Sequence, residues 1–273
     1  MKLETLGQFG LDYAPCQYGL SRLYFRGPRK SLDGDYVACI GGNETYGRFL
    51  ATTFTDLMQI QLGRTCVNFG CVNAGIDAYI RDSAMMAACH DAAAVVVQVM
   101  GAQNQSNRFY TVHPRRNDRF LRPTAALVTL YPDVDFANFT FTRHMLAVLL
   151  LTSPERFELV REELQAQWLH SMQSLLAEIR GPALLLWMAE HAPDDEETIM
   201  RSDPLFVSRN MLDEISALTQ GYVEIVPSQA DLASGAEALI YGPAEAHSAA
   251  QMLGLTAHET AAEQMCAVLN TMI

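Results

Sequence analysis

The sequence predicts an α/β fold with a doubly wound, mostly parallel sheet, and three observations lead to this fold class. Short apolar segments alternate with longer segments of helical periodicity along most of the chain. Residues 93–100 are almost entirely apolar, as is typical of a central parallel strand that is buried on both faces. Hydrophobic residues make up 49% of the 273 and charged residues 18%, so the chain is expected to bury a core.

Five apolar runs have the length of strands: 36–40, 65–69, 93–100, 183–188 and 222–226. Helices are expected over four other segments: 45–62, 75–92, 154–179 and 256–272. The third helix has the clearest ends, because Ser153 and a proline open it and Gly181-Pro182 follow it. Thr256 and Glu259 have the spacing of a capping box at the start of the last helix.

The chain length favours one large domain with additions. Residues 1–34 contain turn signals without a sustained period, and we interpret them as an N-terminal arm. Residues 35–273 are then a single domain. Within it, residues 101–143 are rich in Asn, Arg, Pro and aromatic residues and are interpreted as a long loop or small insertion.

The composition excludes several classes of partner. A formal net charge of −12 and a pI of about 4.9 argue against nucleic acid and against anionic membrane surfaces. The most apolar runs are far too short to span a bilayer, and the N-terminus does not have the pattern of a signal peptide. The six cysteines lack metal-type spacing, so we expect free thiols, a cytoplasmic location and neither a metal nor a cofactor. Homo-oligomerisation stays possible.

The first three predicted strands are each followed by a loop that combines glycine with polar side chains. Because ligands bind at the carboxyl ends of strands in doubly wound sheets, these loops are the candidate site. Amide side chains and glycine N–H groups can hydrogen-bond sugar hydroxyls or an oxyanion. The candidate ligand-binding residues are Gly42, Glu44, Thr45, Asn73, Gly75, Gln103 and Asn104, with Asn43 in the first loop and His258 near the last helix as candidate catalytic positions.

These segments resemble the SGNH, or GDSL-like, hydrolase superfamily. Ile-Gly-Gly-Asn-Glu-Thr-Tyr-Gly corresponds to the nucleophile block, and three shorter matches are Asn73-Ala-Gly75, Gly101-Ala-Gln-Asn104 and Leu255-Thr-Ala-His258. The resemblance implies a flavodoxin-like three-layer sheet, a nucleophile at the position of Asn43, oxyanion donors at Gly75 and at Gln103 or Asn104, and His258 as the base. Tyr-Gly-Arg-Phe and Arg-Arg-Asn-Asp-Arg-Phe also resemble segments of an uncharacterised bacterial family, which implies no known activity.

The chain departs from the superfamily at the residues that perform the chemistry. Asn43 replaces the serine, Gly42 replaces the neighbouring aspartate, and Leu255 replaces the aspartate that orients the histidine. An amide is not a usable oxygen nucleophile. We therefore predict a degenerate hydrolase-like protein that binds a small polar or anionic ligand, with carbohydrate as a candidate, without efficient hydrolysis.

Two alternatives stay open at this point. The first is an active esterase or acyltransferase that uses His258 as its base, with Glu44, Thr45 or Cys71 as candidate replacement groups. The second is a nucleotide-dependent transferase whose phosphate loop is 41–45, although such loops usually carry a lysine.

A group of arginines follows the third loop. Its members are Arg108, Arg115, Arg116, Arg119 and Arg122. Such a group suits a carboxylate, sulfate or phosphate if it lies at the pocket. It can equally pair with acidic residues at the surface.

Overall fold

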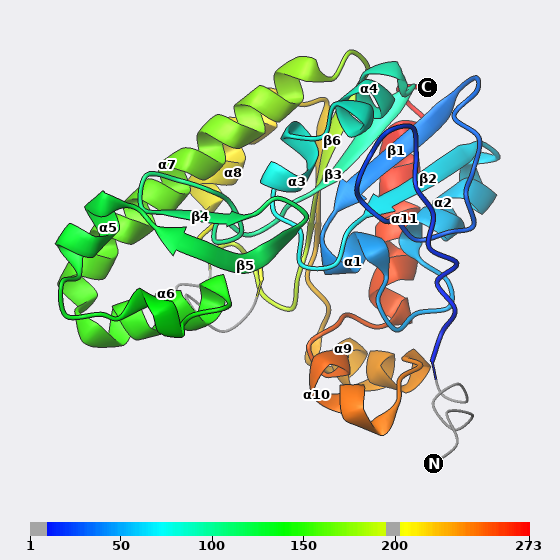
Figure 1. The fold of residues 1–273 in the computed structure, drawn as a ribbon. Coiled ribbons are helices and arrows are strands. Elements are labelled where there is room, and N and C mark those ends of the chain that lie inside the picture. Colours follow the sequence, from blue (N-terminus) through cyan, green and yellow to red (C-terminus); the bar gives the residue numbers. More distant parts are fainter. Residues whose placement is uncertain (1–9, 195–202) are drawn as a thin grey trace.

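The computed structural model describes residues 10–194 and 203–273 (Figure 1). Its main sheet has five parallel strands in the order β2-β1-β3-β6-β7. Their bounds are β1 Tyr36–Gly41, β2 Thr65–Gly70, β3 Ala94–Gln98, β6 Ala183–Met188 and β7 Gly221–Ile225. All five predicted strands are therefore present. The α/β fold class is confirmed.

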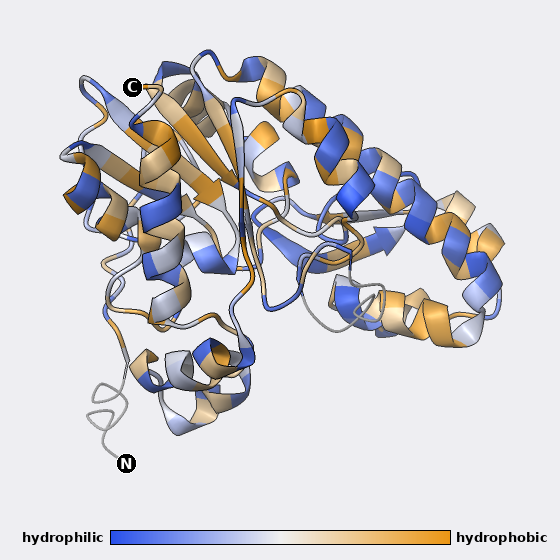
Figure 2. Ribbon diagram, turned by 180° about the vertical axis from the view of Figure 1, so that it is seen from behind, coloured by the Kyte–Doolittle hydropathy of each residue, from blue (hydrophilic) through white to orange (hydrophobic). Residues whose placement is uncertain are grey.

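Helices cover both faces of the sheet, so the domain has three layers (Figure 1). One face packs against α2 (Phe54–Leu62) and α11 (Leu255–Leu269), which contact each other. The other face packs against α3 (Asp77–Ile80), α4 (Ser83–Asp91), the long α7 (Pro154–Glu178) and α8 (Arg209–Ser216). Figure 2 shows hydrophobic strands inside and an alternation of hydrophobic and hydrophilic residues along α7, as expected for a helix with one buried face.

The strand order places a topological switch point between β1 and β3. Counted along the sheet's own strands, the order is 2-1-3-4-5, which is the flavodoxin-like order. The chain leaves β1 toward β2 on one side, and later strands are added on the other side. The loops after β1 and β3 therefore diverge and leave a crevice at their carboxyl ends.

The helix predicted over 45–62 is wrong, because this segment is two helices. The short α1 (Asn43–Tyr46) ends at Gly47, whose φ of 66° is left-handed. Phe49 also has a positive φ of 68°, so the chain cannot continue as a helix. Thr53 and Asp56 then form a capping box, and this box starts α2.

The helix predicted over 75–92 is also divided. Asp82 has an extended conformation and accepts hydrogen bonds from the N–H groups of Ala84 and Met85, so it begins α4 as a new helix. The capping box predicted at Thr256 and Glu259 is wrong, since α11 begins at Leu255 with Gly254 as its N-cap. A Cβ atom at Gly254 would lie 2.3 Å from backbone atoms of Gly235, so only glycine fits this helix start.

The segment 101–143, predicted as a long loop or small insertion, contains regular structure. It forms an antiparallel hairpin of β4 (Tyr110–His113) and β5 (Arg116–Pro123), then α5 (Ala125–Leu130), and leads into α6 (Thr142–Thr152). Figure 1 shows this unit beside α7, away from the main sheet. Tyr110 and Phe120 are buried and join the core on that side.

The described part of the N-terminal segment packs against the sheet. Phe25 lies 5.4 Å edge-on from Phe69 of β2, measured between ring centroids. The partly buried guanidinium of Arg26 donates to the carbonyl oxygen of Tyr46, at the end of α1, and to those of Gly47, Leu50 and Ala51 in the loop that follows. This segment therefore holds the loop that α1 leads into.

Among the described helices, none has the length and apolar character needed to cross a membrane. The six cysteines are free thiols, as predicted, and all except Cys16 are buried.

Candidate functional site

A pocket of about 380 Å³ opens at the carboxyl edge of the sheet, at the switch point between β1 and β3. Three of its walls are the loops after β1, β2 and β3. The end of β6, the segment around Asp203 and residues 250–253 before α11 complete it. Its volume lies within the range of small-molecule sites.

The structure brings most of the predicted site residues into this pocket and leaves three outside its lining. Gly42, Asn43, Glu44, Asn73, Gln103 and Asn104 line it. Thr45, Gly75 and His258 do not. The chain therefore converges at the predicted edge of the sheet, but the histidine is separated from the pocket.

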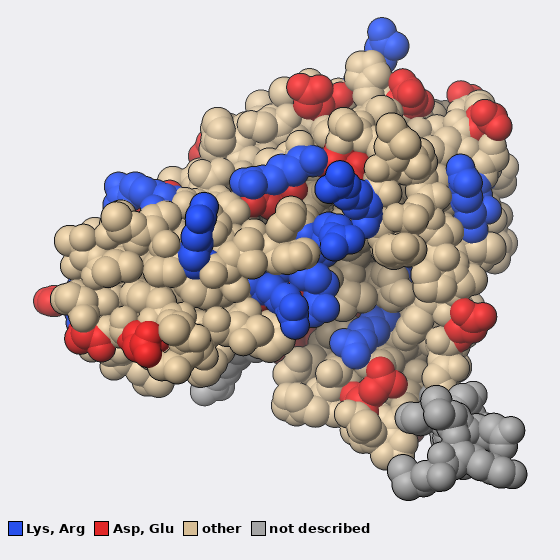
Figure 3. All heavy atoms as spheres, in the orientation of Figure 1, with Lys and Arg blue, Asp and Glu red and all other residues tan. Residues whose placement is uncertain are grey.

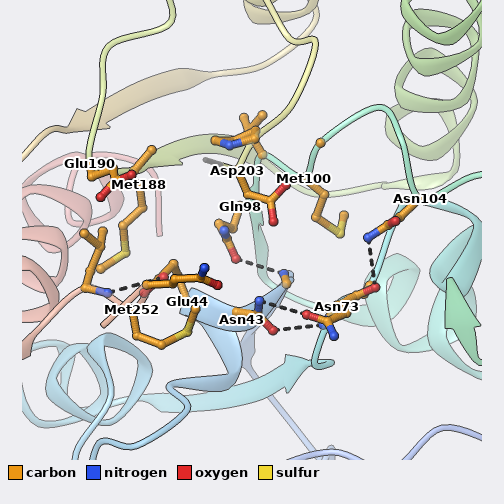
Figure 4. Close-up of a pocket in the computed structure, with 18 of the residues that line it drawn as sticks. Asn43, Glu44, Asn73, Gln98, Met100, Asn104, Met188, Glu190, Asp203 and Met252 are labelled. Carbon is orange, nitrogen blue, oxygen red and sulfur yellow. Dashed lines mark hydrogen bonds between the residues drawn. The ribbon is translucent and has the colours of Figure 1, made fainter. Parts of the chain in front are cut away.

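Gln98, the last residue of β3, holds the first loop in place. Its Oε1 accepts hydrogen bonds from the N–H of Gly42 at 2.9 Å, from the N–H of Thr45 at 3.1 Å and from the hydroxyl of Thr45 at 2.8 Å. Because two of these donors are backbone N–H groups, the orientation of the amide is settled. The Nε2 group has no acceptor among the described residues, and Figure 4 shows it on the side away from the bond to Gly42.

Gln98 was not among the site residues predicted from the sequence. A polar residue inside a run of buried valines was a usable signal, because such a side chain needs a hydrogen-bond partner. Its contacts also occupy two of the backbone donors of loop 41–45, which the nucleotide alternative requires for phosphate. The N–H groups of Gly42 and Thr45 are bound to Gln98 and are not available to a nucleotide.

The amide side chains of the three loops bind one another. Asn43 and Asn73 exchange two hydrogen bonds, from Asn43 Nδ2 to Asn73 Oδ1 at 3.0 Å and from Asn73 N to Asn43 Oδ1 at 2.9 Å. Asn104 Nδ2 donates to the carbonyl of Asn73 (Figure 4). Its Oδ1 accepts from the hydroxyl of Thr142. Asn43 therefore joins two loops of the pocket through its amide.

Gly75 does not have a free N–H group for an oxyanion. Its N–H donates to Asn117 Oδ1 at 2.9 Å. A Cβ atom at this position would lie 1.8 Å from the carbonyl oxygen of Asn104, so the backbones of the second and third loops are in direct contact. The glycine is required for packing between the loops.

His258 is completely buried behind Glu44. Its Nδ1 accepts a hydrogen bond from the N–H of Phe54 at 3.1 Å, so the ring proton is on Nε2. Nε2 lies 3.6 Å from Glu44 Oε2 and has no hydrogen-bond partner within 3.5 Å among the described residues. The lone pair of Nδ1 is thus taken by the backbone N–H of Phe54. Glu44, and not His258, lines the pocket.

A second acidic group lies on another wall. Asp203 accepts a hydrogen bond from Gln103 Nε2 at 2.7 Å and pairs with Arg143 at 3.1 Å. Both Arg143 and Asp203 line the pocket. This carboxylate is therefore compensated by a guanidinium, whereas Glu44 is not.

The chain matches over residues 1–273 a family described as a domain of unknown function, DUF6473. The chain belongs to this family. Comparison of the sequence with curated proteins and with solved structures gave no match. The family description names no activity, so the function of this DUF6473 chain has to be argued from the pocket itself.

Cys71 does not have the properties of a nucleophile in this DUF6473 chain. Burial raises the pKa of its thiol to about 12, and Sγ faces the carbonyl of Tyr24. The residue is absent from the pocket lining, as are Thr45 and His258. Cys71 and His258 therefore cannot act as a catalytic pair on a ligand in this pocket.

The arginines Arg108, Arg115, Arg116, Arg119 and Arg122 lie on the surface and outside the pocket. Figure 3 shows basic side chains gathered across the middle of the face that carries the β4–β5 hairpin. Arg116 pairs with Asp118 at 3.2 Å, and Arg108 lies 3.9 Å from Glu163. These contacts match the alternative in which the arginines pair with acidic residues at the surface.

The chemical capacity of the pocket follows from its lining. Amide groups and the carboxylates of Glu44, Glu190 and Asp203 supply donors and acceptors, and three methionines supply apolar surface. Among the described residues, no group of three or more His, Cys, Asp or Glu side chains is placed to hold a metal ion. No Ser, Thr, Cys, Lys or His of the described residues lines the pocket.

Proposed function

We propose that this protein binds a small hydroxylated ligand, of the size of a monosaccharide, in the pocket between β1 and β3 and does not hydrolyse it by a serine-type route. The observation that carries this proposal is the lining, which is rich in amides and carboxylates and lacks a hydroxyl or thiol nucleophile among the described residues. Sugar hydroxyls donate and accept hydrogen bonds, so they match such a lining.

The location of the pocket supports a binding role. It lies at the switch point of a doubly wound sheet, where this fold class binds its ligands. The superfamily resemblance fits a degenerate hydrolase scaffold, since Asn43 stands at the nucleophile position and lines the pocket. The alternative of an active esterase is supported less, because His258 has no free lone pair that faces a substrate.

An uncharged or cationic ligand fits better than an anionic one. Among the described residues, Glu44, Glu190 and Asp203 contribute three negative charges to the lining, against one positive charge from Arg143. The arginine group lies outside the pocket. An anion would therefore enter a site that repels it.

The test is a thermal-shift screen of monosaccharides and other polyols against the native protein and two tryptophan variants. Ala250 is exposed and lines the pocket, so Ala250→Trp fills its entrance. Ala246→Trp is the control, because Ala246 begins α10 (Ala246–Ala249), the short helix that Ala250 caps, and lies outside the lining. We expect the ligand to raise the melting temperature of the native protein and of the control variant, and to leave that of Ala250→Trp unchanged. Equal stabilisation of all three would place the ligand elsewhere and contradict the proposal.

A further inference from the structure

Glu44 is a mostly buried carboxylate that has no positive partner in the described part of the chain. Its side chain is 12% exposed. Its two polar neighbours are the N–H of Leu253, at 3.5 Å from Oε1 (Figure 4), and Nε2 of His258, at 3.6 Å from Oε2. Within the described residues it has no lysine or arginine within 4.0 Å.

The histidine does not supply the missing charge. An imidazolium would carry a proton on Nδ1, and that proton would face the N–H of Phe54. Keeping the hydrogen bond from Phe54 therefore requires the neutral ring. Neutral His258 lies behind the carboxylate of Glu44, with Nε2 at 3.6 Å from Oε2, and leaves its negative charge uncompensated.

A second unpaired group stands near Glu44. The Nε2 of Gln98 is a donor without an acceptor among the described residues, on a side chain that is 5% exposed and lines the pocket. Gln98 binds the turn 42–45 that contains Glu44. A small ligand can therefore present a positive group to Glu44 and an oxygen acceptor to Gln98 at the same time.

We propose that the ligand of this pocket is a hydroxylated amine whose ammonium group pairs with Glu44 and whose hydroxyl or carbonyl oxygen accepts from Gln98. This inference rests on the proposed function and narrows its ligand to the class of amino sugars and amino alcohols. The ammonium supplies the charge that the protein does not. Met100, Met188 and Met252, which line the same pocket, contact the carbon skeleton.

The experiment compares ligands that differ in one group. Glucosamine, glucose and glucuronate form one series, and ethanolamine, ethylene glycol and glycolate form a smaller one. Dissociation constants are measured by titration calorimetry at low ionic strength for the native protein. We expect the amine to bind at least about tenfold more tightly than the neutral compound, and the acid to bind most weakly.

Two variants separate the proposed pairing of the ammonium with Glu44 from the effect of removing any one negative charge from the protein. In Glu44→Gln, which keeps the shape and removes the charge, the advantage of the amine over the neutral compound should fall below about threefold. Glu263→Gln is the control, since Glu263 is exposed on α11 and lies outside the pocket. If Glu44→Gln does not fold, Glu190→Gln in the exposed part of the lining should reduce the same advantage in part.

The outcomes distinguish this inference from the proposed function. Equal binding of glucose and glucosamine to the native protein, or an unchanged ratio in Glu44→Gln, overturns the inference and leaves the proposed function standing. Tightest binding of glucuronate overturns the inference, together with the expectation that the pocket repels an anion, and leaves the binding of a hydroxylated ligand standing. Absence of binding by every probe at millimolar concentration overturns both the inference and the proposed function.

Discussion

Replacement of Gln98 tests whether one side chain holds the first loop of the pocket. Gln98→Met keeps the length of the side chain and removes the oxygen that accepts from Gly42 N, Thr45 N and the Thr45 hydroxyl. These groups are buried, so water cannot replace the lost acceptor. Each unsatisfied buried N–H costs about 1–3 kcal/mol, and the hydroxyl can rotate to another acceptor. We therefore expect the free energy of unfolding to fall by about 3–5 kcal/mol.

Two further variants give this prediction its controls. Gln98→Glu keeps an acceptor for the same donors, and we expect its stability to exceed that of Gln98→Met by at least about 2 kcal/mol. Thr45→Val removes only the hydroxyl donor and should cost about 1 kcal/mol. Urea unfolding followed by tryptophan fluorescence measures these differences, since Trp168 and Trp187 are both fully buried. Gln98→Met and Thr45→Val with equal stability would refute the role of Gln98.

Three further predictions concern the packing of the loops, the missing nucleophile and the buried thiols. Gly75→Ala should lower the free energy of unfolding by more than about 3 kcal/mol, because the new Cβ would lie 1.8 Å from a backbone oxygen. Gly242→Ala is the control, since no atom lies within 4 Å of its new Cβ, and it should change the free energy of unfolding by less than about 0.5 kcal/mol in the same urea assay. Asn43→Ser should not gain hydrolysis of p-nitrophenyl acetate, since Nε2 of His258 faces Glu44; a clear gain over the native rate would show that the superfamily arrangement is intact. Burial raises the pKa of the Cys66 and Cys71 thiols from 9.0 to about 12, so the unfolded chain loses these protons first as the pH rises. The stabilisation that comes from these two thiols should therefore be complete below pH 9 and fall between pH 9 and 12. Urea midpoints that do not change between pH 9 and 12 would contradict this prediction.

The strands were predictable because their signal is local. A run of apolar residues such as 93–100 must be buried wherever it lies, and each run became a strand of the sheet. The interruption of the helix at 47–53 was not predictable from periodicity. It depends on the left-handed backbone of Gly47 and Phe49. It also depends on Arg26, more than twenty residues earlier in the chain, which donates to the carbonyl groups of Gly47 and Leu50.

The site was predictable in location and less so in its contacts. The rule that ligands bind at the carboxyl ends of strands brought Asn43, Asn73 and Asn104 to one pocket. The part played by His258 depends on which of its nitrogen atoms binds Phe54, a residue 204 positions away along the chain. No sequence pattern contains that contact. His258 does lie in the last helix, but its neighbours are Phe54 and Glu44, which were not predicted from the sequence.

The order of the groups at Glu44 explains why a serine at position 43 would not be sufficient for hydrolysis. In a serine hydrolase the imidazole stands between a carboxylate and the nucleophile, and its free nitrogen takes the proton. Here the carboxylate stands between the imidazole and the pocket, and the nitrogen that faces it already carries a proton. A serine at position 43 would meet a carboxylate whose charge is uncompensated and an imidazole that cannot accept. The same arrangement makes Glu44 suitable for holding a cation, because the imidazole beside it is neutral and does not reduce the charge of its oxygens.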